Sequence, residues 1–572
     1  MEGLKVNLLL PPDQSCHKHE QKRNEDEPLI EKQICAVNDM NEGEMREFEV
    51  ENHKMLVIKS NGEFSAIGHL CAHLGAPLVK GVLSNGKVRC PRHGACFNIK
   101  TGDIEEYPTL DGVQSYQVKI QDNNVIISAC AEALETNRRT QLMLAPVSLS
   151  KRIILIIGGG PAALVCAETL RQQFFKGRII MAIKEIHLPY DRSKLSKSPN
   201  LGIKSLLLRQ PEFFSTYGIE MMTNMEVVSV NPSKKRVGFI DGTSQQYNDL
   251  LLAPGCVVFK YRPRKLYCPG ADLKNIFSLS TPEEARKIDR FSKGKAIVIV
   301  GASFIGMEVA WYLMHKAKSV TVIGKRKVPF QDVLGIDIGT AIMKLKSLVS
   351  NLKSLTLQSL EAENVKFYME NTVIEFRGQN RLLGAVVLED GVILAAQVCV
   401  VGIGVKPATT FLQNSGIRTD VMGQVIVNKS METNVTKVFA AGDVTTFPLP
   451  LRNDEAVSIR HWQIAHSHGH VAALNMLKKK ASFHSVPYFW STMSKNSLRY
   501  AGYGAGSEEV IIHGNLDELT FVAFYIKGNN VIAACSMNSD PVVSQVAEVL
   551  SLGKTISKEE ASRADMPWTK KI

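Results

Sequence analysis

The sequence predicts a multidomain protein with a small all-β domain first, two Rossmann-like α/β nucleotide-binding domains next and an α+β domain last. The chain of 572 residues is long enough for three to four domains. Before residue 130, short apolar runs are separated by Asn-Gly and Asp-Gly turns, which is typical of antiparallel strands. After residue 151, a buried strand, a glycine-rich turn and a helix follow one another twice, starting at Arg152 and Lys295.

The composition changes along the chain and indicates where these domains begin and end. A disordered tail precedes the β domain, a linker follows it, and the second nucleotide-binding domain interrupts the first. The expected limits are 1–30 for the tail, 31–130 for the β domain, 131–150 for the linker, 151–275 and 410–480 for the first nucleotide-binding domain, 276–409 for the second, and 481–572 for the C-terminal α+β domain.

The overall composition excludes several other classes of protein. Hydrophobic residues make up 45% and charged residues 22% of the chain, as in an ordinary globular protein. The 68 Lys and Arg residues exceed the 56 Asp and Glu residues by 12, and this surplus is not gathered in one block, so no nucleic-acid partner is predicted. No apolar run reaches the roughly 18 residues of a membrane-spanning helix, so we expect a soluble protein without a membrane span.

The cysteines and the first residues indicate a reducing, intracellular compartment. An odd number of scattered cysteines, 11 in all, argues against a secreted disulfide framework. The first residues, MEGLKVNLLLPPDQ, lack the pattern of a signal or transit peptide. We therefore expect a cytoplasmic or mitochondrion-associated protein with no clear targeting peptide.

The β domain contains two short Cys/His pairs, Cys71-Ala-His73 and Cys90-Pro-Arg-His93. Two thiolates and two imidazoles are the ligands of a [2Fe–2S] cluster of the Rieske type, in which one iron takes both cysteines and the other takes both histidines. The alternatives are a zinc site, which more often uses CxxC and HxxxH spacing, or unrelated core residues. The surrounding segments, CAHLGAPL and CPRHGACFN, resemble the Rieske family in both loops.

The first nucleotide-binding domain opens with RIILIIGGGPAALVCAETL, a strand, a turn and a helix. Gly158 permits the tight turn, Gly160 lets the backbone approach a pyrophosphate, and Ala163 allows the helix to pack closely on the strand. A turn of this kind can also serve packing alone. Glu185, at the end of the next strand, is the acid expected to bind the ribose.

The second nucleotide-binding domain repeats the pattern in AIVIVGASFIGMEVAWYL, with Gly301, Ser303 and Gly306 at the turn. In NAD-specific domains the next strand usually ends in an acid, whereas here a glycine is followed by Lys325 and Arg326. Cations at this position suit a 2′-phosphate, so the sequence favours NADPH over NADH. The alternative is a solvated basic turn.

Two further segments resemble flavoproteins. TNVTKVFAAGD, which ends in Asp443, resembles the second flavin signature of the pyridine-nucleotide-dependent flavoprotein reductases and implies FAD, with Asp443 bound to its ribityl chain. HLPYDRSKLSK, residues 187–197, resembles the apoptosis-inducing-factor and Rieske-type ferredoxin-reductase group, and this similarity covers residues 150–570. The CxxxxC pair that disulfide reductases carry at this point is absent from the sequence, so thiol–disulfide chemistry is not expected.

The resemblance implies roles for individual residues. Residues 151–275 and 410–480 would bind FAD, and residues 276–409 would bind NAD(P)H. Lys197 would pair with Glu308 beside the flavin, and these two are the candidate catalytic residues. The helix after His461 would direct its N-terminal end at the flavin, with the opposite edge of the helix, which carries His466 and His468, in solvent. The remaining cofactor contacts implied are Arg192, Val227, Trp462, Trp490, which would shield the flavin region, and Gly402 at the NAD(P) site.

Together these modules imply a chain of electron carriers. A nicotinamide gives two electrons as hydride, a [2Fe–2S] cluster takes one at a time, and FAD can do both. The resemblance therefore implies electron transfer from NAD(P)H through FAD to the cluster and on to an unidentified acceptor, together with a pro-apoptotic role. The alternative is a redox-sensing signalling protein with little turnover. Homodimerisation stays open.

Overall fold

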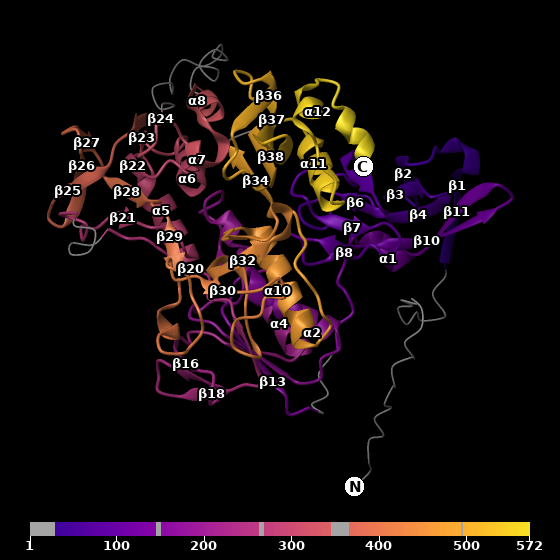
Figure 1. Cartoon of the computed structure of the whole chain (residues 1–572), viewed down its shortest axis with the longest axis horizontal. Coiled ribbons are helices and arrows are strands. Elements are labelled where there is room, and N and C mark those ends of the chain that lie inside the picture. The colour runs from indigo at the N-terminus through magenta and orange to yellow at the C-terminus, as the bar shows by residue number, and fades with distance from the viewer. Residues whose placement is uncertain (1–28, 145–149, 262–267, 345–364, 494–495) are drawn as a thin grey trace, which may run out of the picture.

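The computed structural model describes residues 29–144, 150–261, 268–344, 365–493 and 496–572. It contains the four predicted parts in the predicted order, so the fold class is confirmed. Figure 1 shows the N-terminal β domain on one side of the molecule, beside the C-terminal domain, with the two nucleotide-binding domains on the other side. Among the helices of these ranges, none combines the length and the apolar character needed to cross a bilayer. The predicted tail falls mostly outside the described residues.

The N-terminal domain contains two main antiparallel sheets and a two-stranded one. Its tight turns are those that the sequence predicts: Asn61-Gly62 and Asn85-Gly86 all have positive φ, as a two-residue hairpin turn requires. The larger sheet has the order β1 (Leu29–Ala36), β11 (Asn124–Cys130), β10 (Ser115–Gln121), β4 (Glu63–Gly68), β3 (His53–Ser60) and β2 (Met45–Val50). The smaller sheet contains β5 (Val82–Ser84), β6 (Lys87–Arg89), β7 (Cys96–Asn98) and β8 (Ile104–Glu106).

The segment that the sequence predicts as a linker carries secondary structure of its own. Helix α1 (Ala131–Glu135) buries Leu134 in the core of the N-terminal domain. Strand β12 (Arg138–Arg139) then pairs with β9 (Gly112–Val113) of the same domain. These pieces are too short to produce a recognisable period in the sequence. The N-terminal domain therefore extends to at least residue 139.

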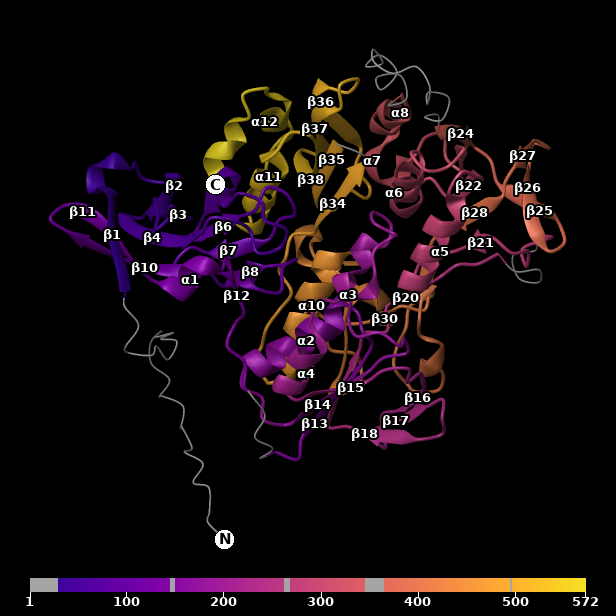
Figure 2. The ribbon, with the colours of Figure 1, turned by 180° about the vertical axis from the view of Figure 1, so that it is seen from behind.

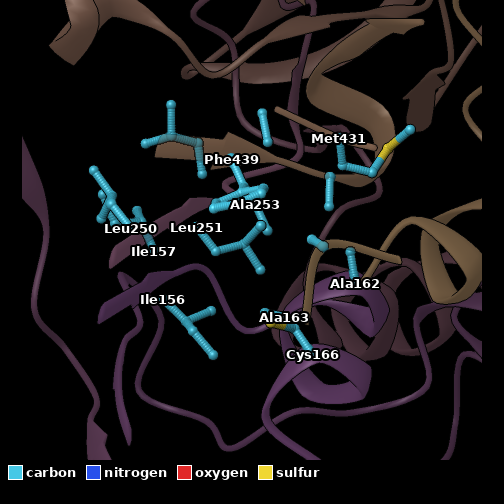
Figure 3. Packing of buried hydrophobic residues seen from close by; sticks show 14 of the residues in the cluster. Ile156, Ile157, Ala162, Ala163, Cys166, Leu250, Leu251, Ala253, Met431 and Phe439 are labelled. Carbon is cyan, nitrogen blue, oxygen red and sulfur yellow. The ribbon is translucent and has the colours of Figure 1, made fainter. Parts of the chain in front are cut away.

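The first nucleotide-binding domain is built on a parallel sheet with the order β15 (Ile219–Met222), β14 (Arg178–Ala182), β13 (Ile153–Ile157), β19 (Asp249–Leu252) and β31 (Val438–Ala440). Helix α2 (Pro161–Gln172) packs against α10 (Trp462–Met476) so closely that a Cβ at Gly469 would lie 2.2 Å from the Ala162 carbonyl oxygen. Figure 3 shows Ile156 and Leu251 of the sheet close to Ala163 and Cys166 of α2. The domain also contains α3 (Ile203–Leu206), α4 (Pro211–Thr216), β16 (Val227–Asn231), β17 (Arg236–Phe239), β18 (Ser244–Gln246), β30 (Val425–Ile426), β32 (Thr445–Leu449) and β33 (Glu455–Val457).

The second nucleotide-binding domain has the same plan. Its parallel sheet has the order β21 (Ile276–Phe277), β28 (Val398–Val401), β22 (Ala296–Val300), β23 (Ser319–Gly324) and β24 (Val365–Met369). Its helices are α5 (Pro282–Ser292), α6 (Phe304–Leu313), α7 (Gln331–Leu334) and α8 (Ile336–Lys344), and a hairpin sheet adds β25 (Val373–Gln379), β26 (Leu382–Leu388) and β27 (Ile393–Ala395). The two domains are joined by β20 (Cys256–Val258) pairing with β29 (Val405–Pro407).

The C-terminal domain is an antiparallel sheet with helices against it. The strand order is β34 (Tyr488–Met493), β35 (Asn496–Gly502), β38 (Asn530–Met537), β37 (Thr520–Lys527) and β36 (Glu509–Asn515). Helices α11 (Val542–Ser551) and α12 (Lys558–Ser562) follow. Figures 1 and 2 both show α11 beside β6 and β7 of the N-terminal domain, so residues that are more than 400 positions apart in the chain lie next to one another.

A buried ion network joins these two domains. Arg89, at the end of β6, is 1% exposed, and its guanidinium donates to Glu548 of α11 and, at 2.7 Å, to Glu106 of β8. A third hydrogen bond, of 3.0 Å, goes to the Gly94 carbonyl. Burial alone would lower the pKa of Arg89, but the two carboxylates outweigh it and the pKa is raised. A buried charge of this kind is tolerated only while its partners are in place, so the network fixes how the two domains pack.

A second contact ties the N-terminal domain to the first nucleotide-binding domain. Arg209 lies 2.9 Å from Asp111 of the N-terminal domain and 2.9 Å from Glu168 of α2. All three side chains are largely buried, with exposed fractions of 14% or less. The N-terminal domain is therefore held at two separate places.

We predict that Glu548→Gln lowers the free energy of unfolding by about 2 kcal/mol, because Arg89 then loses one of its charged partners in a buried site. Glu220→Gln is the matched control. It removes one carboxylate from the Arg178–Glu220 pair, whose side chains are 46% and 44% exposed, and is expected to cost about 0.5 kcal/mol or less. Urea unfolding measures the change in the free energy of unfolding for each variant. Equal changes would show that the buried network stabilises the docked domains no more than an exposed ion pair does.

Candidate functional site

The two cluster loops predicted from sequence have the same backbone geometry. In the first loop, the amide of Cys71 donates to the Ala76 carbonyl and the amide of Gly75 donates to the Cys71 carbonyl, both within 2.9 Å. The second loop has the same two bonds: the amide of Cys90 donates to the Ala95 carbonyl, and the amide of Gly94 donates to the Cys90 carbonyl. In each loop the glycine has positive φ, +69° and +76°, which lets the chain turn back behind the ligand pair.

The four predicted ligands meet as two like pairs. The Cys71 and Cys90 thiols are buried and hydrogen-bonded to one another, which raises the pKa of Cys71 and lowers that of Cys90. The Nδ1 atoms of His73 and His93 face each other at 3.1 Å. Burial is the main effect that lowers the pKa of His93 to about 2 and that of His73 to about 4, and nearby charges act more weakly on both, so both rings are neutral, as metal ligands must be.

This donor set fits a two-iron cluster. Two sulfurs form one pair and two imidazole nitrogens form the other, which is the Cys₂ and His₂ division of a Rieske centre. Within the described ranges, no group of three or more His, Cys, Asp or Glu side chains surrounds a single ion position. A cluster in which each iron takes only two protein ligands does not need such a group, whereas a structural zinc ion usually takes four.

The first dinucleotide cradle has the expected shape. Gly158 has φ +128°, and a Cβ there would lie 2.0 Å from the Ala253 carbonyl oxygen. A Cβ at Gly160 would meet nothing within 4 Å, so open space lies beside the N-terminus of α2, where no side chain caps the free amides. Ala163 is fully buried against the sheet. Free amides beside open space suit a pyrophosphate, so these residues fit the adenine-nucleotide half of FAD.

The acidic residues of this domain are in two different situations. Glu185 accepts hydrogen bonds from Arg192 at 2.6 Å and from the Tyr190 hydroxyl at 2.7 Å, so its carboxylate is already engaged, and its ribose role stays a prediction. Asp443 follows β31, and burial raises its pKa to about 6, against the opposing effect of Arg460 and Arg192. Val227, predicted near the adenine, begins β16 and is 9% exposed.

The structure brings Lys197 and Glu308 together. The Lys197 ammonium lies 2.9 Å from the Glu308 carboxylate, which is 7% exposed. Two hydroxyls that sequence reasoning missed also donate to this carboxylate, those of Ser196 and, at 2.7 Å, Ser491 of β34. Glu308 lies on α6, so the pair joins the first nucleotide-binding domain, the second and the C-terminal domain.

Trp490 lies between the cluster loops and α10. Its ring centroid is 4.7 Å from that of His93, 5.7 Å from that of His73 and 5.5 Å from that of His461. His461 is the N-cap of α10 and Trp462 its first residue, and the His461 Nδ1 is buried without a partner. Burial lowers the pKa of His461 to about 3. The predicted role of Trp490 was to shield the flavin region, and the structure adds direct contact with both histidine ligands.

The prediction that the far edge of α10 lies in solvent is wrong. His466 and His468 are both 0% exposed. The His466 ring packs on Tyr107 of the N-terminal domain, 5.2 Å away, and His468 packs on Phe447, 4.4 Å away. The docked N-terminal domain covers the edge of the helix that the isolated sequence pattern leaves open.

The second dinucleotide cradle repeats the close approaches of the first. A Cβ at Gly301 would lie 2.2 Å from the Gly402 carbonyl oxygen, and a Cβ at Gly306 would lie 2.0 Å from that of Gly301. Ser303 is the N-cap of α6 and makes no side-chain capping bond, so the helix amides are available to a phosphate. This cradle fits a pyridine nucleotide.

The end of β23 carries the cations that the sequence singled out. A Cβ at Gly324 would lie 2.6 Å from the Met369 methyl and 2.9 Å from the Ala302 Cβ, so a side chain at this position would require these neighbours to shift. Lys325 and Arg326 are both exposed, and the Arg326 Nε is 3.0 Å from Asp332. Lys325 is therefore placed to meet a phosphate directly, whereas Arg326 would have to exchange partners.

Family models match the chain in the order of its domains. A model of the Rieske [2Fe-2S] domain matches residues 31–117, a model of the pyridine nucleotide-disulphide oxidoreductases matches 152–469, and a reductase C-terminal model matches 488–570. The middle match covers more than half of the chain.

Individual relatives differ in how much of the chain they share. Apoptosis-inducing factor 3 of Homo sapiens is 49% identical over 551 residues, 94% of this chain and 88% of its own. Rhodocoxin reductase of Rhodococcus erythropolis is 27% identical over 72% of this chain and 92% of its own. The crystal structure of the ferredoxin reductase for the CYP199A2 system from Rhodopseudomonas palustris has a TM-score of 0.66 at 27% identity, over 73% of this chain and 99% of that one.

We predict that Asp443 destabilises the flavin-free protein as the pH rises. Its folded-state pKa, about 6, lies above its ordinary value of 3.8, so its contribution to stability is fully present below pH 4 and is lost as the pH passes 6. In urea unfolding, the advantage of Asp443→Asn over the flavin-free wild type should grow by about 1 kcal/mol between pH 5 and pH 7. An identical pH dependence in both proteins would contradict this, and the variant should bind FAD more weakly.

Proposed function

This chain belongs to the pyridine nucleotide-disulphide oxidoreductase family, and we propose that it passes electrons from NADPH through FAD to its own [2Fe–2S] cluster and then to a separate acceptor. The predictions of a Rieske domain, of FAD and of an NAD(P)H-dependent oxidoreductase are confirmed by the family models and by the reductases among the relatives. The preference for NADPH, the roles of individual residues and the acceptor are parts of the proposal.

The observation that carries the proposal is the position of Trp490. Bound FAD would supply the conversion between a two-electron hydride and single electrons, and a bound [2Fe–2S] cluster would take those electrons one at a time. Trp490 contacts His461, at the predicted flavin end of α10, and both histidine ligands of the cluster. One aromatic side chain therefore spans the boundary between the two redox sites, with no solvent layer between it and either neighbour.

The residues on the opposite side of the same strand suit the hydride step. The Glu308 carboxylate holds the Lys197 ammonium at 2.9 Å, and Ser491 fixes the carboxylate from β34. A positive charge held beside the flavin would stabilise the negative charge that the ring gains on reduction. Glu308 therefore orients Lys197, and the Lys197 ammonium neutralises charge on the side of the flavin that would accept hydride. Trp490 lies on the side from which electrons would pass to the cluster.

Anaerobic mixing with NADPH tests the proposal. In the wild type, flavin absorbance should bleach first, and the electron paramagnetic resonance signal of a reduced Rieske cluster should follow. Trp490→Leu should slow cluster reduction about tenfold or more, which is about 1.4 kcal/mol of barrier, and should change the bleaching rate much less. Trp311→Leu is the matched control, because Trp311 stacks with Phe330 on the second nucleotide-binding domain, away from the cluster ligands.

Other outcomes of this experiment separate the alternatives. Bound FAD that NADPH barely reduces would favour the redox-sensing signalling protein that the resemblance also allows, and a pro-apoptotic role would then rest on the name of the relative apoptosis-inducing factor 3. Rapid bleaching with a cluster that stays oxidised would refute internal electron transfer. An unchanged rate of cluster reduction in Trp490→Leu would remove Trp490 from the path but not the path itself.

We predict that the Lys325→Ala/Arg326→Ala double variant raises the KM for NADPH about tenfold and leaves that for NADH nearly unchanged, because it removes two cations that can bind the 2′-phosphate. Asp332→Asn should act in the opposite direction, since it frees Arg326 from its ion pair. Steady-state rates with both nucleotides give the values. Equal losses for NADH and NADPH would mean that the cations do not select the phosphate.

A further inference from the structure

The histidine side of the cluster site is largely covered, although His73 keeps intermediate exposure beside the first loop. His93 is 9% exposed, and Trp490 covers its ring and that of His73. Behind them, the Tyr488 hydroxyl donates to the Pro91 carbonyl at 3.3 Å, and a Cβ on Gly94 would lie 2.6 Å from the Tyr488 ring. The second cluster loop is thus packed against β34 at Pro91 and Gly94, so the first loop is the more open side of the cluster site.

Undocking of the N-terminal domain, which would expose that side, costs free energy. Separation would leave Glu548 without Arg89 and Arg209 without one of its carboxylates, all in sites that are buried when docked. An acceptor must therefore meet the cluster while the domain stays docked.

The first cluster loop leaves another side open. Leu74 directly follows the ligand His73 and is 52% exposed, and the next residue, Gly75, is exposed as well. The hydrogen bonds within this loop hold Leu74 at the tip of the turn. An apolar side chain held in water beside a metal ligand has no structural role that its surroundings explain.

Two cations lie near His73, the ligand that precedes this leucine. Arg138 is exposed, and its guanidinium donates to the His73 carbonyl at 3.1 Å. Lys194 has a side chain 36% exposed, and its charge also acts on His73. The Asp191 carboxylate, whose charge also acts on His73, is only 9% exposed and lies 3.6 Å from Lys194, so the two cations outnumber this one carboxylate.

We propose that this outer loop surface, formed by Leu74, Arg138 and Lys194, docks an acidic protein that carries one electron at a time. The apolar tip would be desolvated at the centre of the contact, and the cations at its rim would attract a negatively charged carrier. The inference rests on the proposed function and names its acceptor by chemistry. One NADPH reduces two carriers by one electron each and yields NADP⁺ and one proton.

The test uses the full-length holoprotein and two probe proteins, a strongly acidic b-type cytochrome domain and a basic c-type cytochrome. Binding is measured by fluorescence anisotropy of the labelled cytochrome at low and high salt. The variant Arg138→Glu/Lys194→Glu should bind the acidic probe at least about fivefold more weakly, and the basic probe more tightly. Lys234→Glu/Arg236→Glu, which makes the same charge change on and beside β17, should bind like the wild type.

A second measurement distinguishes failure of this inference from failure of the proposed function. In the Arg138→Glu/Lys194→Glu variant, NADPH should still reduce the flavin and then the cluster at wild-type rates, and only the reoxidation of the cluster by the acidic cytochrome should slow. Wild-type binding of the acidic probe by this variant, or equal weakening by the β17 variant, would overturn the docking surface. A cluster that NADPH never reduces would instead overturn the internal path.

Discussion

Strand β34 is the element on which the arrangement of the whole site depends. Successive side chains of a strand point to opposite faces, and this strand uses both. Tyr488 and Trp490 face the second cluster loop and the histidine ligands, whereas Phe489 and Ser491 face α6, where they contact Phe304 and Glu308. A shift of one residue in its register would exchange the two faces and separate every partner at once. Four consecutive residues therefore set the spacing between the Lys197–Glu308 pair and the predicted cluster ligands.

The parts of the site that could be predicted from the sequence are those whose residues lie close together in the chain. Cys71 and His73 are two positions apart, and Cys90 and His93 three, so each ligand pair is fixed by a single turn, and the glycine turns before α2 and α6 are equally local. The pairing of Lys197 with Glu308 spans more than 100 residues and came from resemblance to a family. Nothing in the sequence links Arg89 to Glu548, because their contact exists only once two distant domains have packed. Ser491 could have been suspected only from its place beside Trp490.

Docking of the N-terminal domain also explains why the predicted solvent-exposed edge of α10 is buried. His466 and His468 alternate with small residues, and this pattern predicts a polar helix edge that is exposed to solvent. In the folded chain, Tyr107 of the N-terminal domain covers His466, and aromatic side chains of the first nucleotide-binding domain enclose His468, whose Nδ1 accepts from the Gly442 amide at 3.3 Å. Neither ring is protonated there, because burial lowers both pKa values to about 3. A neutral imidazole can fill an apolar contact that a charged side chain could not, and the helix is covered on both sides as a result.

The two surfaces of the N-terminal domain, the interface around Arg89 and the outer loop surface, differ in their electrostatics. The inner one, around Arg89, is dry and its charges are paired, so salt in the solvent screens it little, and its geometry is permanent. Fusion in one chain also removes the entropy cost of finding a partner, which a separate ferredoxin would meet at each encounter. The proposed outer loop surface carries more cations than carboxylates, so an encounter there would be fast, brief and sensitive to salt. A permanent interface suits the carrier that is always reduced from the same flavin, and a transient one suits a carrier that must leave with its electron.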